Sequence, residues 1–105
     1  LPGFVVNVDA IKAKGVDTVV CMAVNDAFVM GAWGKAQNAE HIFMLADGNA
    51  DLTRALGLEL DGTGFGMGTR SKRFAMIVNN GVVELLNVDA AALEKSTAET
   101  ILAAL

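Results

Sequence analysis

The stretch VVCMAVNDAFVMGAWGKAQNAEHIFMLA, residues 19–46, decides the fold of this 105-residue chain. It opens with six consecutive apolar residues, Val19 to Val24, and closes with a second apolar run, Ile42 to Ala46. Continuous, partly β-branched runs of this kind are typical of strands buried on both faces of a sheet. Between the two runs, Asn25 and Asp26 offer an N-cap for a helix. We therefore expect a strand, a helix and a second strand, the unit from which partly parallel sheets are built.

The predicted helix carries two glycines. Gly31 and Gly34 each weaken a helix by about 1 kcal/mol relative to alanine, so we expect close packing at these positions. Phe28 and Trp33 are expected to pack in the core or in an interface. Together they belong to an apolar stripe formed by Phe28, Val29, Ala32 and Trp33.

The alternation continues on both sides of this unit. Apolar residues spaced by three predict a helix from about Phe4 to Lys14, which Gly15 ends in a left-handed conformation. A short helix is predicted from Asn49 to Leu56, with Gly57 as its stop. The side chains expected to point inward from this helix are Leu52, Ala55 and Leu56.

The last third of the chain predicts a hairpin and a helix. Strands are expected at Arg73–Asn79 and Val82–Val88, because Asn80-Gly81 between apolar runs is a strong signal for a type I′ turn. The sequence Ser96-Thr97-Ala98-Glu99 fits a capping box at the start of a final amphipathic helix.

The predicted fold class is α/β, a sheet flanked by helices in the order α-β-α-β-α-β-β-α, with antiparallel strands added by the hairpin as in thioredoxin-like folds. A helix that enters a parallel strand is normally the second half of a β-α-β crossover, so the pattern indicates N-terminal strands missing upstream. The chain also begins with Leu1 rather than Met, which leaves open a processed, trimmed or fragmentary product.

Composition excludes several classes of protein. Hydrophobic residues make up 53 % and charged residues 19 % of the chain, which is too apolar for a disordered protein. The six-residue run is far short of the roughly 18 residues that a membrane span needs. The net charge of −4 argues against electrostatic binding to nucleic acid or to a membrane. One cysteine excludes an internal disulfide or a multi-cysteine metal site, and we expect no metal and no cofactor.

Two features can carry chemistry. Cys21 lies inside the first apolar run, where it is either a small buried hydrophobe or a reactive thiol. Arg70, Lys72 and Arg73 form a basic cluster, which is either a solvated loop end or, since Arg73 opens a strand, a set of donors for a thiolate or another anion.

Two other features are not expected to bind ligands. The glycine-rich segment Gly62–Gly68 leads into a strand rather than a helix, so a nucleotide site is disfavoured and a flexible loop is expected. His41, the only histidine, is expected on the surface.

Several blocks of the sequence resemble the peroxiredoxin family, and more closely its type II branch, which is atypical and depends on glutaredoxin or thioredoxin. The resemblance covers essentially the whole chain and implies a thioredoxin-like fold. The blocks are VNDAFVM (24–30) with AWG (32–34), LADG (45–48), ALGL (55–58), RSKRFA (70–75), NGVV (80–83) and LNV (86–88).

The opening Leu1-Pro2-Gly3-Phe4 matches the family as well. In the family this tetrapeptide closely follows the peroxidatic cysteine, which lies in a Pro-x-x-x-Thr-x-x-Cys motif that is absent here. Residues 1–105 therefore resemble a partial redoxin domain, the C-terminal two-thirds of such a protein. We expect a partly exposed sheet, domain swapping or association with a second copy.

The resemblance assigns roles to two residues. Arg73 matches the active-site arginine, which would lie against the peroxidatic thiolate and orient the peroxide. Cys21 matches a second cysteine that acts as the resolving thiol in some members, notably plant enzymes, and is not required in others. Direct reduction of the sulfenic acid by glutathione or glutaredoxin is the competing expectation.

The implied function is a thiol-dependent peroxidase that reduces hydrogen peroxide and alkyl hydroperoxides in antioxidant defence and redox homeostasis. Glutaredoxin with glutathione, or thioredoxin, is the expected reductant, and a homodimer is expected from the family. The alternative is a catalytically inactive redoxin fragment that acts as a binding or assembly module. A glutaredoxin-type oxidoreductase lacks support, since no Cys-x-x-Cys or Cys-x-x-Ser is present. The expected location is cytoplasmic, with an organellar one left open.

Overall fold

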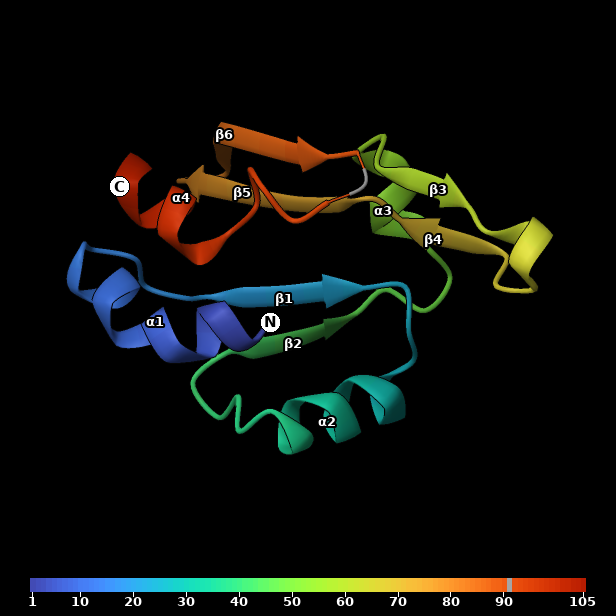
Figure 1. Cartoon of the computed structure of the whole chain (residues 1–105), viewed down its shortest axis with the longest axis horizontal. Coiled ribbons are helices and arrows are strands. Elements are labelled where there is room, and N and C mark those ends of the chain that lie inside the picture. The colour runs from blue at the N-terminus through green and yellow to red at the C-terminus, as the bar shows by residue number, and fades with distance from the viewer. Residues whose placement is uncertain (91) are drawn as a thin grey trace.

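A computed structural model of the chain describes residues 1–90 and 92–105. Helices and strands alternate at first, and a long hairpin and a final helix follow (Figure 1). The helices are α1 (Pro2–Ala13), α2 (Ala27–Ala36), α3 (Asp51–Ala55) and α4 (Ala98–Ala104), with a 3-10 turn, η1, at Thr63–Phe65. The strands are β1 (Val20–Ala23), β2 (Phe43–Ala46), β3 (Glu59–Asp61), β4 (Thr69–Ser71), β5 (Arg73–Asn79) and β6 (Val82–Asp89).

The strand-helix-strand unit predicted from residues 19–46 is confirmed. β1 and β2 pair in parallel, from Val20 opposite Phe43 to Ala23 opposite Ala46. α2 connects them, and its N-cap is Asp26, whose Oδ1 accepts a hydrogen bond of 2.8 Å from the Val29 N–H. A hydrogen bond between residues three positions apart therefore fixes where α2 begins.

The two glycines of α2 differ. Gly34 is buried, and a Cβ placed there would lie 3.0 Å from Cγ of Met44 in β2, so the expected close packing is confirmed at this position. Gly31 is exposed, and a Cβ there would have no neighbour within 4 Å. The expectation is wrong for Gly31, because that residue faces solvent rather than the sheet.

The core lies where α1 covers the first strand pair. Its buried members come from α1, from the segment entering β1 and from the segment entering β2. Leu102 and Leu105 of the C-terminal segment pack against the same cluster, so both ends of the chain meet at one core. The buried residues are Val8, Ile11, Val19, Ala39 and Ile42.

The hairpin is confirmed, and a second antiparallel pair was not predicted. Asn80 and Gly81 have φ values of 52° and 80°, which is the conformation a type I′ turn needs. β3 and β4 pair antiparallel, and the Gly62 N–H donates to the Gly68 carbonyl at 2.6 Å. The glycine-rich segment is thus the loop that joins two short antiparallel strands, which we call the ribbon, and the predicted element order lacked these two strands. Three-residue strands are too short to produce a readable periodicity.

The cap of α4 lies one residue later than the capping box predicted. Thr97 is the N-cap, and its Oγ1 accepts a hydrogen bond of 3.1 Å from the Thr100 N–H. The Ser96 hydroxyl instead donates to the carboxylate of Asp89 at 2.6 Å. A partner seven residues earlier therefore takes the hydroxyl that the capping box had assigned to the helix start.

The strands form three separate pairs in the described part of the chain: β1 with β2, β3 with β4, and β5 with β6. β1 and β5 face each other across a space without hydrogen-bonding, as Figure 1 shows. Val20 and Phe43 are 51 % and 58 % exposed, so the prediction of strands buried on both faces is wrong for these residues. The expected partly exposed sheet is present.

The inward face predicted for α3 is wrong for Leu52 and Ala55, whereas Leu56 is half-buried. Leu52 is 41 % exposed and Ala55 is exposed, whereas Thr53 is completely buried. Asp47 explains the difference, because its carboxylate accepts hydrogen bonds from the Thr53 N–H at 2.7 Å and from the Thr53 hydroxyl at 2.6 Å. This polar contact turns Thr53 inward and leaves Leu52 at the wall of the space beside β1.

Candidate functional site

A large cavity separates β1 from β5. Its volume is about 1520 Å³, and its walls come from β1, β5, the N-terminal end of α1 and the segment that leads into α4. Cys21 of β1 and Arg73 of β5 both line it. The tertiary structure therefore places the two residues singled out from the sequence on one cavity, although they lie 52 positions apart in the chain.

Cys21 lies in the middle of β1, opposite Met44 of β2. It is half-buried and packs against the core cluster beneath α1. Burial raises the pKa of the Cys21 thiol above its ordinary value, because a thiolate is costly to form away from water. Leu1, just before α1, lines the same cavity as Cys21 and packs against the same core cluster.

Arg73 is the first residue of β5 and is exposed to the cavity. Lys72 separates it from β4, and the Lys72 N–H donates to the Leu58 carbonyl at 2.8 Å, which holds the chain at the turn from the ribbon into the hairpin. Among the described residues no carboxylate forms an ion pair with Arg73. Its guanidinium is available to an anion in the cavity, since arginine presents five N–H donors in a fixed geometry.

Asp89 lies opposite Arg73 in the β5–β6 register, but its carboxylate is engaged elsewhere. It is buried and accepts hydrogen bonds from the Ser96 hydroxyl and from the N–H groups of Glu94, Lys95 and Ser96, at 2.6, 3.1, 2.7 and 3.0 Å. The Ser96 hydroxyl contributes most to holding the pKa of Asp89 well below its usual range; the three N–H groups act in the same direction, and burial opposes them.

The Asp89 contact joins the end of β6 to the segment before α4, which forms part of the cavity wall. It therefore holds this part of the cavity wall in place. Sequence reasoning missed this residue. The available signal was an aspartate at a strand end followed by a short loop, where carboxylates commonly accept backbone N–H groups.

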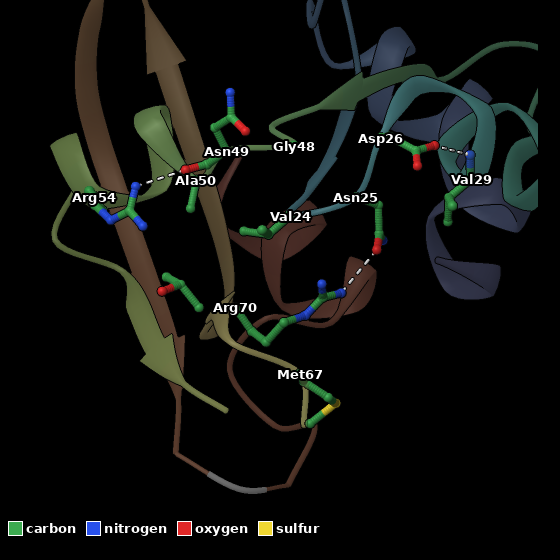
Figure 2. A pocket seen from close by; sticks show the side chains of 11 residues that line it. Val24, Asn25, Asp26, Val29, Gly48, Asn49, Ala50, Arg54, Met67 and Arg70 are labelled. Carbon is green, nitrogen blue, oxygen red and sulfur yellow. Dashed lines mark hydrogen bonds between the residues drawn. The ribbon is translucent and has the colours of Figure 1, made fainter. Parts of the chain in front are cut away.

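A second hollow, which we call the basin, lies beyond the carboxyl ends of β1 and β2. Its volume is about 570 Å³, and Asn25 and Arg70 line both the basin and the larger cavity. The Arg70 Nη2 donates to Asn25 Oδ1 at 3.0 Å, which ties the ribbon to the end of β1 (Figure 2). Asn25 was predicted only as a capping residue. Its position directly after a parallel strand was the signal, because ligands bind at that edge of open α/β sheets.

The other residues discussed from the sequence lie outside this arrangement. His41 is exposed, as expected, whereas Phe28 is 88 % exposed and Trp33 is half-buried. Among residues 1–90 and 92–105, no three His, Cys, Asp or Glu side chains are grouped closely enough to hold a metal ion. No helix in these same ranges is both long and apolar enough to cross a bilayer. The site thus combines a thiol with the cationic side chain of Arg73 on one cavity.

Known proteins resemble this chain over its full length. The Redoxin family model matches residues 2–102. The chain is 45 % identical over 107 residues to peroxiredoxin-2D of Arabidopsis thaliana, covering 100 % of this chain and 66 % of the relative. It is 44 % identical over 110 residues to the chloroplastic peroxiredoxin-2E-2 of Oryza sativa subsp. japonica, covering 100 % of this chain and 49 % of the relative. The chain therefore spans about half to two thirds of these relatives.

A solved structure agrees with the sequence comparisons. Reduced Prx3 from Vibrio vulnificus in complex with hydrogen peroxide is 64 % identical, with a TM-score of 0.95. The match covers 99 % of this chain and 68 % of that protein.

Proposed function

The chain belongs to the Redoxin family, as a peroxiredoxin with a thioredoxin-like fold, and from this premise we propose that it is part of a thiol-dependent peroxidase. The proposed substrates are hydrogen peroxide and alkyl hydroperoxides. The observation that carries the proposal is the cavity on which the free Arg73 guanidinium and the Cys21 thiol both lie. Because the chain spans only part of its relatives, the activity is proposed for the whole protein.

Cys21 is poorly suited to attack the peroxide itself. Its pKa is raised, it lies within a strand, and it lacks the helix N-terminus that stabilises reactive thiolates. We therefore assign the attack to a thiolate from a part of the whole protein outside residues 1–105. Its sulfur bonds to one peroxide oxygen, the O–O bond breaks, and the other oxygen leaves with the electron pair and takes a proton as water or alcohol. The sulfur is oxidised to a sulfenic acid.

Arg73 would assist this step through its charge. A guanidinium beside the reacting sulfur favours thiolate over thiol. The same donors stabilise the negative charge that moves onto the leaving oxygen as the O–O bond breaks. An arginine already paired with a carboxylate would do this less well, so the absence of an ion pair for Arg73 among the described residues supports the role.

Cys21 is the candidate for the resolving step. Its thiolate would attack the sulfenic sulfur, forming the S–S bond, and the hydroxide that leaves would take a proton as water. Leu1, just before α1, and Cys21 line the same cavity and pack against the same core cluster, which favours this role. Half-burial of Cys21 opposes it, because the thiol must become accessible first. Reduction of the sulfenic acid by glutathione, with or without glutaredoxin, or by thioredoxin remains the alternative.

The proposal extends to assembly and location. A homodimer would cover Phe28, whose side chain stands almost fully exposed at the start of α2, and Trp33 is the second aromatic candidate. Sedimentation of the wild type and of a Phe28→Ser variant tests this contact. A cytoplasmic location is proposed and would be tested by fractionation.

The deciding experiment is peroxide consumption with dithiothreitol as reductant. The whole protein should turn over peroxide, and Arg73→Met should lower kcat/KM by about 100-fold or more, as for loss of one preorganised donor. Residues 1–105 alone should not exceed the background of a free thiol. Turnover by the 105-residue chain that Cys21→Ser abolishes would overturn the assignment of roles, and an inactive whole protein would favour a binding or assembly module.

A further inference from the structure

The position of Arg73 depends on the backbone that carries it. Among residues 1–90 and 92–105, no carboxylate forms an ion pair that would hold its guanidinium in place. Arg73 opens β5, three residues after Arg70 of β4. We propose that Arg70 and Asn25 are positioning residues for Arg73, because the hydrogen bond between them fixes the turn that carries Arg73. The effect on catalysis rests on the proposed function, whereas the fixing of the turn does not.

The hydrogen bond between Arg70 and Asn25, which we call the link, differs from the other side-chain hydrogen bonds. Nη2 of Arg70 donates to Oδ1 of Asn25 at 3.0 Å, as Figure 2 shows. The two residues lie 45 positions apart. Every other side-chain hydrogen bond in the described ranges joins residues no more than eight positions apart. The link is therefore the one such bond there that connects distant segments of the chain.

The Asn25 end of the link is anchored on α2. The side chain of Asn25 is half-buried, and its Nδ2 lies 3.9 Å from Sδ of Met30. Met30 belongs to α2 and is only 1 % exposed, so it offers a fixed partner. With the amide nitrogen directed to Met30, the amide oxygen remains for Arg70. A hydrogen bond from a guanidinium to this oxygen is charge-assisted and stronger than one between neutral groups.

The Arg70 end of the link is anchored on the ribbon. A Cβ built at Gly62 would lie 3.3 Å from Cγ of Arg70, so the aliphatic part of the arginine packs against the ribbon backbone. Two residues after Arg70, the Lys72 N–H donates to the Leu58 carbonyl at 2.8 Å, and Arg73 follows. The chain from Arg70 to Arg73 is therefore short and held at both ends, so a shift of Arg70 is passed on to Arg73.

The link crosses one end of the cavity that holds Cys21 and Arg73. Asn25 and Arg70 both line this cavity. In the described part of the chain β1 and β5 form no hydrogen bonds with each other, so no sheet pairing sets their separation there. Asn25 follows β1 and Arg70 precedes β5, so their bond restrains the distance between the two strands. A misplacement of about 1 Å can reduce a catalysed rate about 100-fold, so this restraint matters for Arg73.

The kinetic test uses the whole protein with dithiothreitol as reductant and measures kcat/KM for hydrogen peroxide. Asn25→Ala removes the acceptor of the link and leaves every charge in place. It should lower kcat/KM about tenfold, which is less than the loss expected for Arg73→Met because the guanidinium is displaced rather than removed. Arg70→Met should cause a similar loss. Arg54→Met is the matched control, since it removes the same side chain from α3 beside the basin, and it should leave kcat/KM unchanged.

Two further variants separate positioning from a loss of folded protein. In the Arg73→Met background, Asn25→Ala should have no further effect, because the group that the link positions is absent. A loss of folded protein would lower kcat/KM in both backgrounds. Asn25→Asp keeps an oxygen that accepts from Arg70, and it should recover most of the activity lost in Asn25→Ala.

Hydrogen exchange of the whole protein without peroxide examines the turn independently of activity. The Lys72 N–H should exchange about tenfold faster in Asn25→Ala and in Arg70→Met, because loss of the link makes opening of the turn easier. Arg54→Met should exchange at the wild-type rate at this position. Wild-type exchange at Lys72 in both link variants would refute the fixing of the turn.

Four kinetic results would overturn the positioning role. They are a wild-type kcat/KM in Asn25→Ala, an equal loss in Arg54→Met, a full further loss in the Arg73→Met background, and no recovery in Asn25→Asp. The first of these, with a loss in Arg70→Met, would assign the effect to the charge of Arg70 itself. Circular dichroism shows whether each variant is folded, and Arg70→Met gives an independent reading if Asn25→Ala is not. A whole protein that consumes no peroxide would refute the proposed function, and hydrogen exchange would still decide whether the link holds the turn.

Discussion

Alanine substitutions at the two glycines of α2 should change stability in opposite directions. Alanine favours the helix over glycine by about 0.8–1 kcal/mol in a helix interior. A Cβ at Gly31 meets nothing within 4 Å, so Gly31→Ala should gain this full amount. A gain of about 1 kcal/mol should raise Tm by about 4–8 °C for a domain of this size.

Gly34→Ala brings the same gain in helix stability, but it also carries a packing cost. The new Cβ would lie 3.0 Å from Cγ and 3.6 Å from Sδ of Met44. Forcing an extra carbon into a packed interface costs about 1–3 kcal/mol. The net effect should lie between about 0 and 2 kcal/mol of destabilisation, once the helix gain of about 1 kcal/mol is subtracted.

Urea unfolding followed by circular dichroism measures both variants against the wild type. The double variant Gly34→Ala with Met44→Ala removes the contact, and there the substitution at position 34 should again stabilise by about 1 kcal/mol relative to Met44→Ala alone. If Gly34→Ala remained unfavourable in that background, Met44 would not be the cause. Equal effects of Gly31→Ala and Gly34→Ala would refute the reasoning as a whole.

Three further outcomes are expected. Asp89→Asn should lower the midpoint of thermal unfolding at neutral pH. Because the folded state lowers the pKa of Asp89, its stabilisation is complete above the unfolded value of about 3.9 and is lost as pH falls below it, so the difference between wild type and variant should shrink in acid. Hydrogen exchange should be faster at the N–H groups of Val20 and Met22 than at those of Cys21 and Ala23. The carbonyls of Val19 and Ala23 accept hydrogen bonds from the segment of β2, so the N–H groups of Cys21 and Ala23 also face β2, and those of Val20 and Met22 face the opposite edge of β1. Uniform protection across β1 would show that its free edge is paired in solution. Alkylation of Cys21 by iodoacetamide should have its pH midpoint above that of the urea-unfolded chain, since burial raises the thiol pKa, and a lower midpoint would contradict that effect.

The features predicted correctly are those that neighbouring residues decide. Asp26 caps α2 through a contact three residues away, and Asn80-Gly81 forms the turn of the hairpin. The apolar runs of β1 and β2 and the alternation with helices were sufficient for the α/β class. Arg73 and Cys21 were singled out by residue type, by position and by resemblance.

The wrong or missing features depend on partners that lie more than about four residues away, beyond the reach of local capping and turn rules. Ser96 does not cap α4 because Asp89, seven residues earlier, takes its hydroxyl. Leu52 faces outward because Asp47 binds Thr53, and the ribbon β3–β4 forms from strands too short to show a pattern. In each case a long-range or polar contact outweighs local propensity.

By itself, the sequence determined the order of the main elements, the turns and caps that depend on a few consecutive residues, and the residue types available for chemistry. Only the tertiary structure decided which of them meet. It placed Cys21 and Arg73 on one cavity, raised the Cys21 pKa through burial, and joined Asn25 to Arg70 across 45 positions. The physical reason is that hydrogen-bonding rules for caps and turns act within about four residues, whereas burial, charge environment and the walls of a site depend on how distant segments pack.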